Sequence, residues 1–294
     1  MEHSEVWKSG RIVRFLTKDK VKLNGILFAD SSDAKTCLIY IHGMTGSFVS
    51  SIVGALANAL PQGFGLFSFN NRGHDQVSSM SKFIGAKRVR FRAGTSFEKF
   101  EDSVYDIGGA IDAMQKLGFR KFILCGHSTG CQKAIYYQYK MHDRRVSGIA
   151  LLGPADDYNL LKKQLGRRYA VVKGKCKRLI SKGKGEVIPD LEIGLCAQRL
   201  DSQINLGRVE ARLLDYSGPM KEFGAIKVPI LAVFGSEEEY RLMHVDKHLD
   251  ILSRKSRSMH FSKLVIPDAN HSFTSNETVL AKNIYAWAAA LKSS

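Results

Sequence analysis

The sequence predicts an α/β protein with a mostly parallel central sheet and helices on both faces. Apolar runs alternate with amphipathic stretches along most of the 294 residues. Several of these runs are continuously apolar, as in strands buried on both faces, and turns that carry glycine or polar residues follow them. The runs are Cys37–Ile41, Gly65–Phe69, Phe122–Cys125, Val146–Leu152 and Val228–Phe234. Right-handed crossovers bring the carboxyl ends of such strands to one edge, so the turns should meet there.

The remaining elements follow in order. Two short, partly alternating stretches, Arg11–Leu16 and Val21–Phe28, predict an antiparallel pair at the sheet edge. Ser262–Ile266 predicts a last strand. Apolar residues at helical spacing predict helices, one ended by Pro61 and one by Gly118. These helices are expected over 50–60, 102–117, from the turn after Cys125 to about 141, 241–253 and 278–291.

The alternation stops between residues 158 and 227, a polar, glycine-dotted and highly charged stretch. We therefore predict one core domain, formed by residues 1–157 and 228–294, and an insertion over 158–227. No internal repeat or long low-complexity tract is visible in the chain.

Composition excludes several classes of protein. Hydrophobic residues make up 44% and charged residues 24%, values that argue against disorder, collagen-like repeats and a small disulfide scaffold. The five cysteines are odd in number and form no CxxC or Cys/His cluster, so we expect reduced, buried thiols and no metal. The N-terminal residues lack the features of a signal peptide, and no apolar stretch reaches about 20 residues. A cytoplasmic location is the expectation.

The most informative motif is Gly126-His127-Ser128-Thr129-Gly130, which directly follows one predicted strand and directly precedes a helix. Such a tight turn holds the serine in a strained conformation, and the flanking glycines remove side chains that would clash. The serine oxygen then stands in the cleft beside the positive end of the helix. The alternative interpretation is a glycine-rich loop that only connects the strand to the helix, or one that binds phosphate. Ser128 is our candidate nucleophile.

A serine hydroxyl needs a base, and His271 is the best-placed candidate because it follows the last strand at the same sheet edge. The base in turn needs a carboxylate to orient it. The turn after Val228–Phe234 offers Glu237, Glu238 and Glu239, which spacing alone does not separate. Asp156 and Asp157, after the preceding strand, are the alternatives. The non-catalytic interpretation of the three glutamates is a solvent-exposed helix N-terminus, where acidic residues are favoured by the helix dipole.

A nucleophilic serine also requires backbone N–H groups that stabilise the developing oxyanion. We expect one from Thr129, the residue after the nucleophile, and one from Met44 in the loop after the first central strand. Gly43 would leave room for a substrate. We expect His42, Gly43 and His127 to border that substrate.

These motifs together resemble the α/β-hydrolase superfamily over almost the whole chain. His42-Gly43 resembles its HG oxyanion motif, 71–74 (Asn-Arg-Gly-His) its D-x-R-G-x-G loop, and 126–130 its nucleophile elbow. The turn over 235–240 resembles its G-x-x-D-E-Y/H acid turn, which implies that Glu238 is the acid, although this family usually has Asp there. Asn270-His271 resembles its histidine loop. The turn over 153–157 is also similar to one in a subgroup of fungal and microbial esterases, some of which open siderophore esters.

Net charge is the remaining feature, with 44 Lys and Arg against 28 Asp and Glu, a formal charge of +16. Residues 158–185, where the resemblance implies a cap over the site, contain many cations and no acid. A second basic cluster is Lys82, Lys87, Arg88, Arg90 and Arg92. The clusters could attract an anionic substrate or an anionic membrane surface, or could simply form a solvated, mobile cap. Specific nucleic-acid binding is less expected, because no reading motif and few aromatics accompany the charge.

The sequence therefore predicts a serine hydrolase that cleaves a carboxylic ester through an acyl-enzyme, without any cofactor. The substrate would be a small-molecule ester, which the basic clusters suggest could be anionic. The alternatives are a thioesterase or acyltransferase on the same fold, and a non-catalytic binding protein of this fold with an anion-binding basic cap. The oligomeric state is left open.

Overall fold

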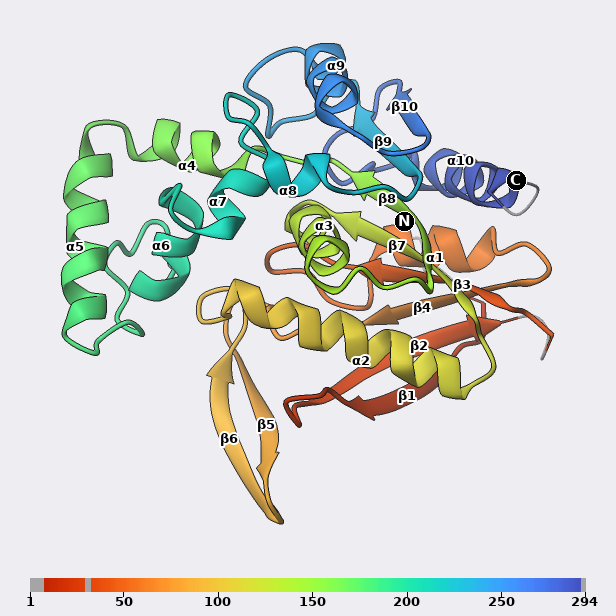
Figure 1. Cartoon of the computed structure of the whole chain (residues 1–294), viewed down its shortest axis with the longest axis horizontal. Helices are drawn as coiled ribbons and strands as arrows, with labels where there is room; N and C mark the ends of the chain where they lie inside the picture. The colour runs from red at the N-terminus through yellow and green to blue at the C-terminus, as the bar shows by residue number, and fades with distance from the viewer. Residues whose placement is uncertain (1–7, 30–32, 292–294) are drawn as a thin grey trace, which may run out of the picture.

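A computed structural model describes residues 8–29 and 33–291 of the chain. An eight-stranded sheet crosses the molecule in the order β1-β2-β4-β3-β7-β8-β9-β10 (Figure 1). Its strands are β1 (Arg11–Leu16), β2 (Lys22–Ala29), β3 (Thr36–Ile41), β4 (Phe64–Phe69), β7 (Lys121–His127), β8 (Val146–Leu152), β9 (Ile230–Gly235) and β10 (Phe261–Ile266). Only the β1–β2 and β2–β4 pairings are antiparallel. The predicted sheet and its antiparallel edge are confirmed.

Helices cover both faces of this sheet, as predicted. One face packs against α1 (Ser51–Asn58) and α10 (Glu277–Ala290), and the other against α2 (Ser103–Lys116), α3 (Thr129–Met141) and α9 (Val245–Lys255). Neighbouring residues of the central strands, such as Leu38 and Ile39, belong to opposite hydrophobic clusters because side chains alternate along a strand. All five cysteines are free and buried, as expected.

The insertion divides into two parts. The cap consists of α4 (Asp157–Leu165), α5 (Tyr169–Ser181) and α6 (Ala197–Ile204), with a small core of its own around Val172, Cys176 and Leu200. The following α7 (Val209–Leu213) and α8 (Lys221–Gly224) instead send Leu213 and Phe223 into the main core. The second half of the predicted insertion is thus packed with the core domain.

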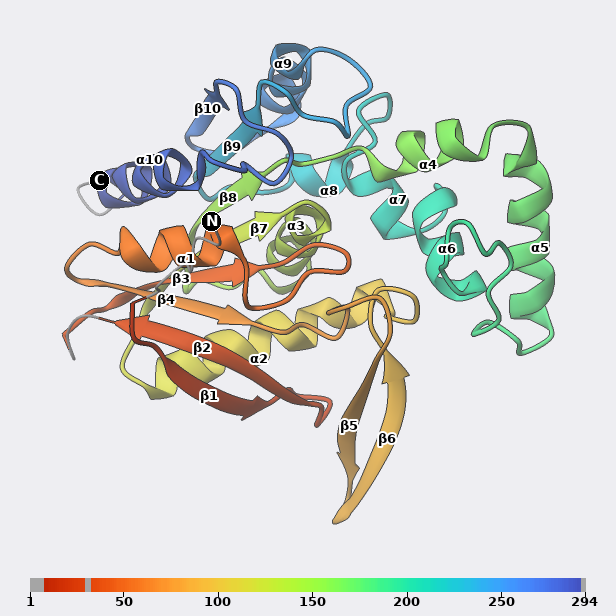
Figure 2. The same ribbon diagram turned by 180° about the vertical axis from the view of Figure 1, so that it is seen from behind.

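One hairpin was not predicted from the sequence, and one helix begins later than expected. The basic cluster around residue 88 forms a two-stranded hairpin, β5 (Ser78–Ile84) and β6 (Lys87–Ala93), which projects from the body (Figures 1 and 2). Its cations interrupt the apolar alternation that would have indicated strands. The helix expected from residue 241 begins only at Val245, because the backbone before it forms the turn around Glu238. No helix within the described ranges is long and apolar enough to cross a membrane.

A buried chain of charges connects the cap to the core. Arg199 on α6 is fully buried and contacts the carboxylates of Glu210 on α7 and Glu98 beside α2. Lys133 on α3, also buried, donates to Glu98 at 2.7 Å and to Asn71 at 3.1 Å. Charges removed from water are tolerated only when they are paired, so these side chains fix the cap helix against the core.

This network gives a stability prediction. Arg199→Ala leaves the Glu98 and Glu210 carboxylates short of a buried partner, so we expect a loss of about 3–5 kcal/mol in the free energy of unfolding. Urea unfolding followed by circular dichroism measures it.

The control is Lys263→Ala, which removes the half-exposed Lys263–Asp250 pair and should cost less than about 1 kcal/mol. Equal losses in the two variants would contradict a stabilising role for the buried network.

Candidate active site

Ser128 lies in a strained turn between β7 and α3. Its φ of 55° and ψ of −127° fall in a region that side-chain-bearing residues rarely adopt. Close backbone packing forces this shape: a Cβ on Gly130 would lie 2.0 Å from the Ile41 carbonyl oxygen, and one on Gly126 would lie 2.3 Å from the Gly130 oxygen. Only glycine fits at these two positions, and the turn presents Ser128 at the carboxyl edge of the sheet.

His271 and Glu238 form a buried pair. The imidazole Nδ1 lies 2.7 Å from one Glu238 carboxylate oxygen and 2.9 Å from the other, and Glu238 is 1% exposed. The backbone N–H of Tyr240 donates to the same carboxylate at 2.9 Å. With Nδ1 donating to Glu238, the Nε2 atom of the neutral ring is left as the proton acceptor.

The loops that carry these two residues are packed tightly on each other. A Cβ on Gly235 would lie 2.0 Å from the Ala269 carbonyl oxygen, so the end of β9 directly touches the histidine loop. The Glu237 N–H donates to that same carbonyl, and the His271 N–H donates to the Glu239 carboxylate at 2.7 Å. The three glutamates that spacing left equivalent therefore have separate contacts: Glu238 holds the ring, Glu239 holds the backbone, and Glu237 is exposed.

His127 packs beside His271, with ring centroids 4.9 Å apart, and its Nε2 lies 2.9 Å from the His271 carbonyl oxygen. Burial lowers the pKa of the His127 imidazole to about 4, so the ring is neutral near pH 7 and donates through Nε2. His127 was expected to border the substrate. It lines the cavity, and it also positions the loop of the candidate base.

A cavity of about 620 Å³ opens over these residues. Ser128 and His271 both line it, as do His42, Gly43 and Met44 from the loop after β3. Thr129 is the first residue of α3, where helix N–H groups have no intrahelical acceptor. The structure thus gathers the predicted site residues in one region, while their catalytic roles stay predictions.

His42 is engaged by the protein itself. Its Nε2 accepts from the Asn71 N–H at 3.2 Å, and its Nδ1 lies 2.9 Å from the Gly43 carbonyl oxygen. Burial lowers the pKa of this imidazole to about 3, so it stays neutral. The side-chain oxygen of Asn71 also accepts a hydrogen bond from Lys133. The buried charge network therefore extends to the loop that carries Met44.

Asp156 and Asp157, the alternative acids, do not contact His271. Asp156 caps α4 by accepting from the Asn159 backbone N–H at 3.0 Å, and it also accepts from the Tyr216 N–H. Asp157 accepts from the Gln132 amide at 2.7 Å. Asp156 is therefore a structural residue, whereas Asp157 lines the cavity.

The cavity wall is acidic. Asp75 and Asp157 both line it, and its described lining includes no lysine or arginine. Burial, and after it the negative charge of nearby Glu210, raise the pKa of the Asp157 carboxyl to about 7. An anionic substrate would find no cationic side chain in this lining.

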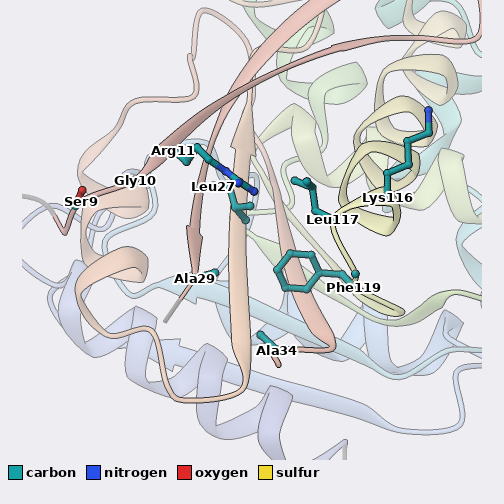
Figure 3. A pocket seen from close by; sticks show the side chains of 10 residues that line it. Ser9, Gly10, Arg11, Leu27, Ala29, Ala34, Lys116, Leu117 and Phe119 are labelled. Atoms are coloured by element: carbon teal, nitrogen blue, oxygen red, sulfur yellow. The ribbon is translucent and has the colours of Figure 1, made fainter. Parts of the chain in front are cut away.

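A second hollow, about 880 Å³, lies between the β1–β2 edge and the end of α2 (Figure 3). Leu27, Ala34 and Phe119 line it together with Arg11 and Lys116, but none of the predicted site residues does. In the described part of the chain, no group of three or more His, Cys, Asp or Glu side chains could hold a metal ion.

Three supporting residues were not singled out by sequence. Gly153 at positive φ leaves room for the histidine, because a Cβ there would lie 2.9 Å from the His271 ring. Tyr240 packs edge-on against that ring at 4.7 Å. Asp75 follows the 71–74 motif directly. Its place in the loop after β4 was the only signal that could have found it.

Comparison with known proteins agrees with this architecture. The family model for the alpha/beta hydrolase fold matches residues 36–219, and the chain belongs to that family. No curated protein matches the sequence. Siderophore hydrolase EstB from Aspergillus fumigatus is similar in structure, with a TM-score of 0.68 at 15% identity over 97% of this chain and 99% of that chain. Est1E from Butyrivibrio proteoclasticus, bound to ferulic acid, has a TM-score of 0.65 at 15% identity over 95% and 99%.

A soluble variant of monoglyceride lipase from Saccharomyces cerevisiae, in complex with a substrate analogue, has a TM-score of 0.64 at 14% identity over 93% of each chain. At such low identity these likenesses define the fold, and the predicted α/β-hydrolase fold is confirmed.

Proposed function

We propose that the protein is a serine hydrolase that cleaves carboxylic esters through an acyl-enzyme. One observation carries the proposal: Ser128, in its strained turn, and His271, held by buried Glu238, line the same cavity. Structural neighbours that include carboxylesterase CesB from Bacillus subtilis and an esterase from Pyrococcus furiosus support the choice of substrate.

In this mechanism His271 Nε2 accepts the proton of the Ser128 hydroxyl as Ser128 Oγ attacks the ester carbonyl carbon. The backbone N–H groups of Met44 and Thr129 donate to the oxyanion. His271 then gives its proton to the departing alcohol as the C–O bond breaks. Water, deprotonated by His271, attacks the acyl-enzyme and releases the acid and free Ser128. Glu238 stabilises the imidazolium in each half-reaction without taking its proton.

The alternatives differ in the leaving group, in the acyl acceptor or in having no reaction at all. A thioesterase or acyltransferase would use the same residues, and the carbonyl chemistry does not separate them. A non-catalytic binding protein would not need a strained serine beside an oriented histidine, and strain of this kind is retained where it has a function.

A fluorophosphonate probe tests the reaction class. We expect covalent labelling at Ser128, located by mass spectrometry, and none in Ser128→Ala. That substitution should lower kcat for a short p-nitrophenyl ester by about 10⁴-fold or more, because the nucleophile is lost. Folded wild-type protein that neither reacts with the probe nor hydrolyses any ester would refute the proposed function.

The assignment of the acid gives a second prediction. Glu238→Gln replaces the carboxylate with an amide that neither fixes the His271 tautomer nor stabilises its cation, so kcat should fall about 10³–10⁴-fold.

Asp156→Asn is the matched control. It should keep kcat within about threefold and lower the free energy of unfolding by less than about 1 kcal/mol, because Asn caps a helix about as well as Asp. Steady-state kinetics and urea unfolding measure the two effects. Full activity in Glu238→Gln together with loss in Asp156→Asn would reverse the assignment.

The acidic lining indicates the class of ester. Asp157 lines the cavity, where its Oδ2 accepts a hydrogen bond from the Gln132 amide, while its Oδ1 has no hydrogen-bond partner in the described ranges. A carboxylate in that position attracts a cationic or hydrogen-bond-donating group of the substrate. We therefore infer a preference for cationic or neutral esters over anionic ones.

A pair of isosteric esters tests this preference. Wild-type kcat/KM should be about tenfold higher for a choline ester than for the 3,3-dimethylbutyl ester of the same acid, and Asp157→Asn should bring the ratio near one. The exposed Asp246→Asn is the control and should leave the ratio unchanged. A wild-type ratio near one, with both esters hydrolysed, would contradict the role of Asp157.

The same ratio should depend on pH. Glu210 and Asp156 raise the pKa of Asp157, whereas Arg199 and His271 lower it; together with burial they place it at about 7. Asp157 is neutral below that pH and negative above it, so the cationic preference should grow as pH rises through about 7. Taking a ratio removes the pH dependence that both substrates share. A ratio constant across this range would show that Asp157 does not set it.

A further inference from the structure

The excess positive charge of the chain is not in the catalytic cavity, whose described lining has acidic residues and no lysine or arginine. It is concentrated in two segments outside the cavity. Residues 78–93 of the hairpin and 169–184 of helix α5 and its end contain no acidic residue. Their cations are Lys82, Lys87, Arg88, Arg90 and Arg92 in the hairpin, and Lys173, Lys175, Lys177, Arg178, Lys182 and Lys184 in and after α5.

Both segments lie on the same half of the molecule: α5 forms one end of its long axis, and the hairpin projects downward from the body between α5 and α2 (Figures 1 and 2). The hairpin base is tied to the cap, since Gln76 and Ser96 both donate to the Gly194 carbonyl oxygen. A surface hollow is lined by Arg90 and Arg92 from the hairpin and by Glu186 from the cap. The base of the hairpin is therefore joined to the cap that carries α5. A single extended partner can reach both basic segments.

Within the hairpin, the register aligns the charges. Ser79 pairs with Arg92, Ser81 with Arg90 and Phe83 with Arg88, so the three arginines share one face of the ribbon. In the described part of the chain these cations form no ion pair with an acidic residue, and neither do those of α5. Unneutralised cations on one surface attract an anionic partner of similar extent.

Exposed apolar side chains lie among these charges. Ile84, at the end of the hairpin, is 60% exposed, and Val171 on α5 is 70% exposed. Apolar side chains beside cations suit a lipid surface, where the former enter the headgroup region and the latter meet anionic lipids.

The aromatic rings that nucleic-acid bases would need are already engaged. Phe91 lies under the Lys82 ammonium, and Tyr169 lies under Lys162 and Lys173. Base stacking requires free ring faces.

From these observations we propose that the β5–β6 hairpin and helix α5 form a docking surface for an anionic phospholipid membrane. The hairpin begins at Ser78, three residues after Asp75, which lines the catalytic cavity, so docking brings the cavity close to the lipid surface. The proposal does not depend on ester hydrolysis.

Vesicle sedimentation tests it. The full chain should sediment with phosphatidylcholine–phosphatidylglycerol vesicles and not with phosphatidylcholine alone, and binding should weaken as sodium chloride increases. Arg88→Glu/Arg90→Glu should lower the partition coefficient by at least about tenfold. Ile84→Ser, which leaves the charge unchanged, should lower it by about fivefold.

The control is Lys116→Glu/Arg120→Glu, which makes the same change in net charge at exposed positions at the opposite end of the sheet. It should stay within about twofold of wild type, and fluorophosphonate labelling and circular dichroism should be unchanged in every variant. The proposal is overturned if wild type ignores anionic vesicles at low salt, or if the control loses as much binding as the hairpin variant. It is equally overturned if a single-stranded oligonucleotide binds and the vesicles do not.

Discussion

The site depends on how closely the loops approach one another at the carboxyl edge of the sheet. At two places a loop lies directly against a backbone carbonyl, and only glycine leaves enough room: Gly130 at Ile41, and Gly235 at Ala269. The first contact locks the serine turn to the end of β3, and the second joins the acid turn to the histidine loop. Residues separated by more than a hundred positions in the sequence thereby share one cavity. A larger residue at either glycine would separate the loops rather than merely crowd them.

The parts of this arrangement that local chemistry determines were predictable from sequence. Continuous apolar runs followed by glycine predicted the parallel strands, and the turn around Ser128 predicted its own strained shape. His271 could be placed because topology brings strand ends to one edge. Predicting Glu238 as the acid required more than topology, because spacing did not separate three adjacent glutamates. The resemblance to the α/β-hydrolases indicated the middle one. The structure separates them by burial, since only Glu238 is enclosed with the imidazole.

What sequence could not provide were relations between distant segments. The chain of contacts from Arg199 through Glu98 and Lys133 to Asn71 joins four parts of the chain, and no local pattern marks its members as partners. The acidic wall of the cavity was equally hidden, because Asp75 and Asp157 belong to different loops. The overall charge of the protein suggested an anionic substrate, yet no lysine or arginine is among the described residues that line the cavity.

The buried ion pairs of α6 also fix the position of the cap on the core. Swinging this helix outward would leave Arg199 and its two carboxylates without partners, a penalty of several kcal/mol. The side chain of Gln203, one turn further along α6, touches Met44, so the same movement would disturb the loop behind it. These ion pairs therefore oppose any outward movement of the cap, and they couple its position to the loop that carries Met44.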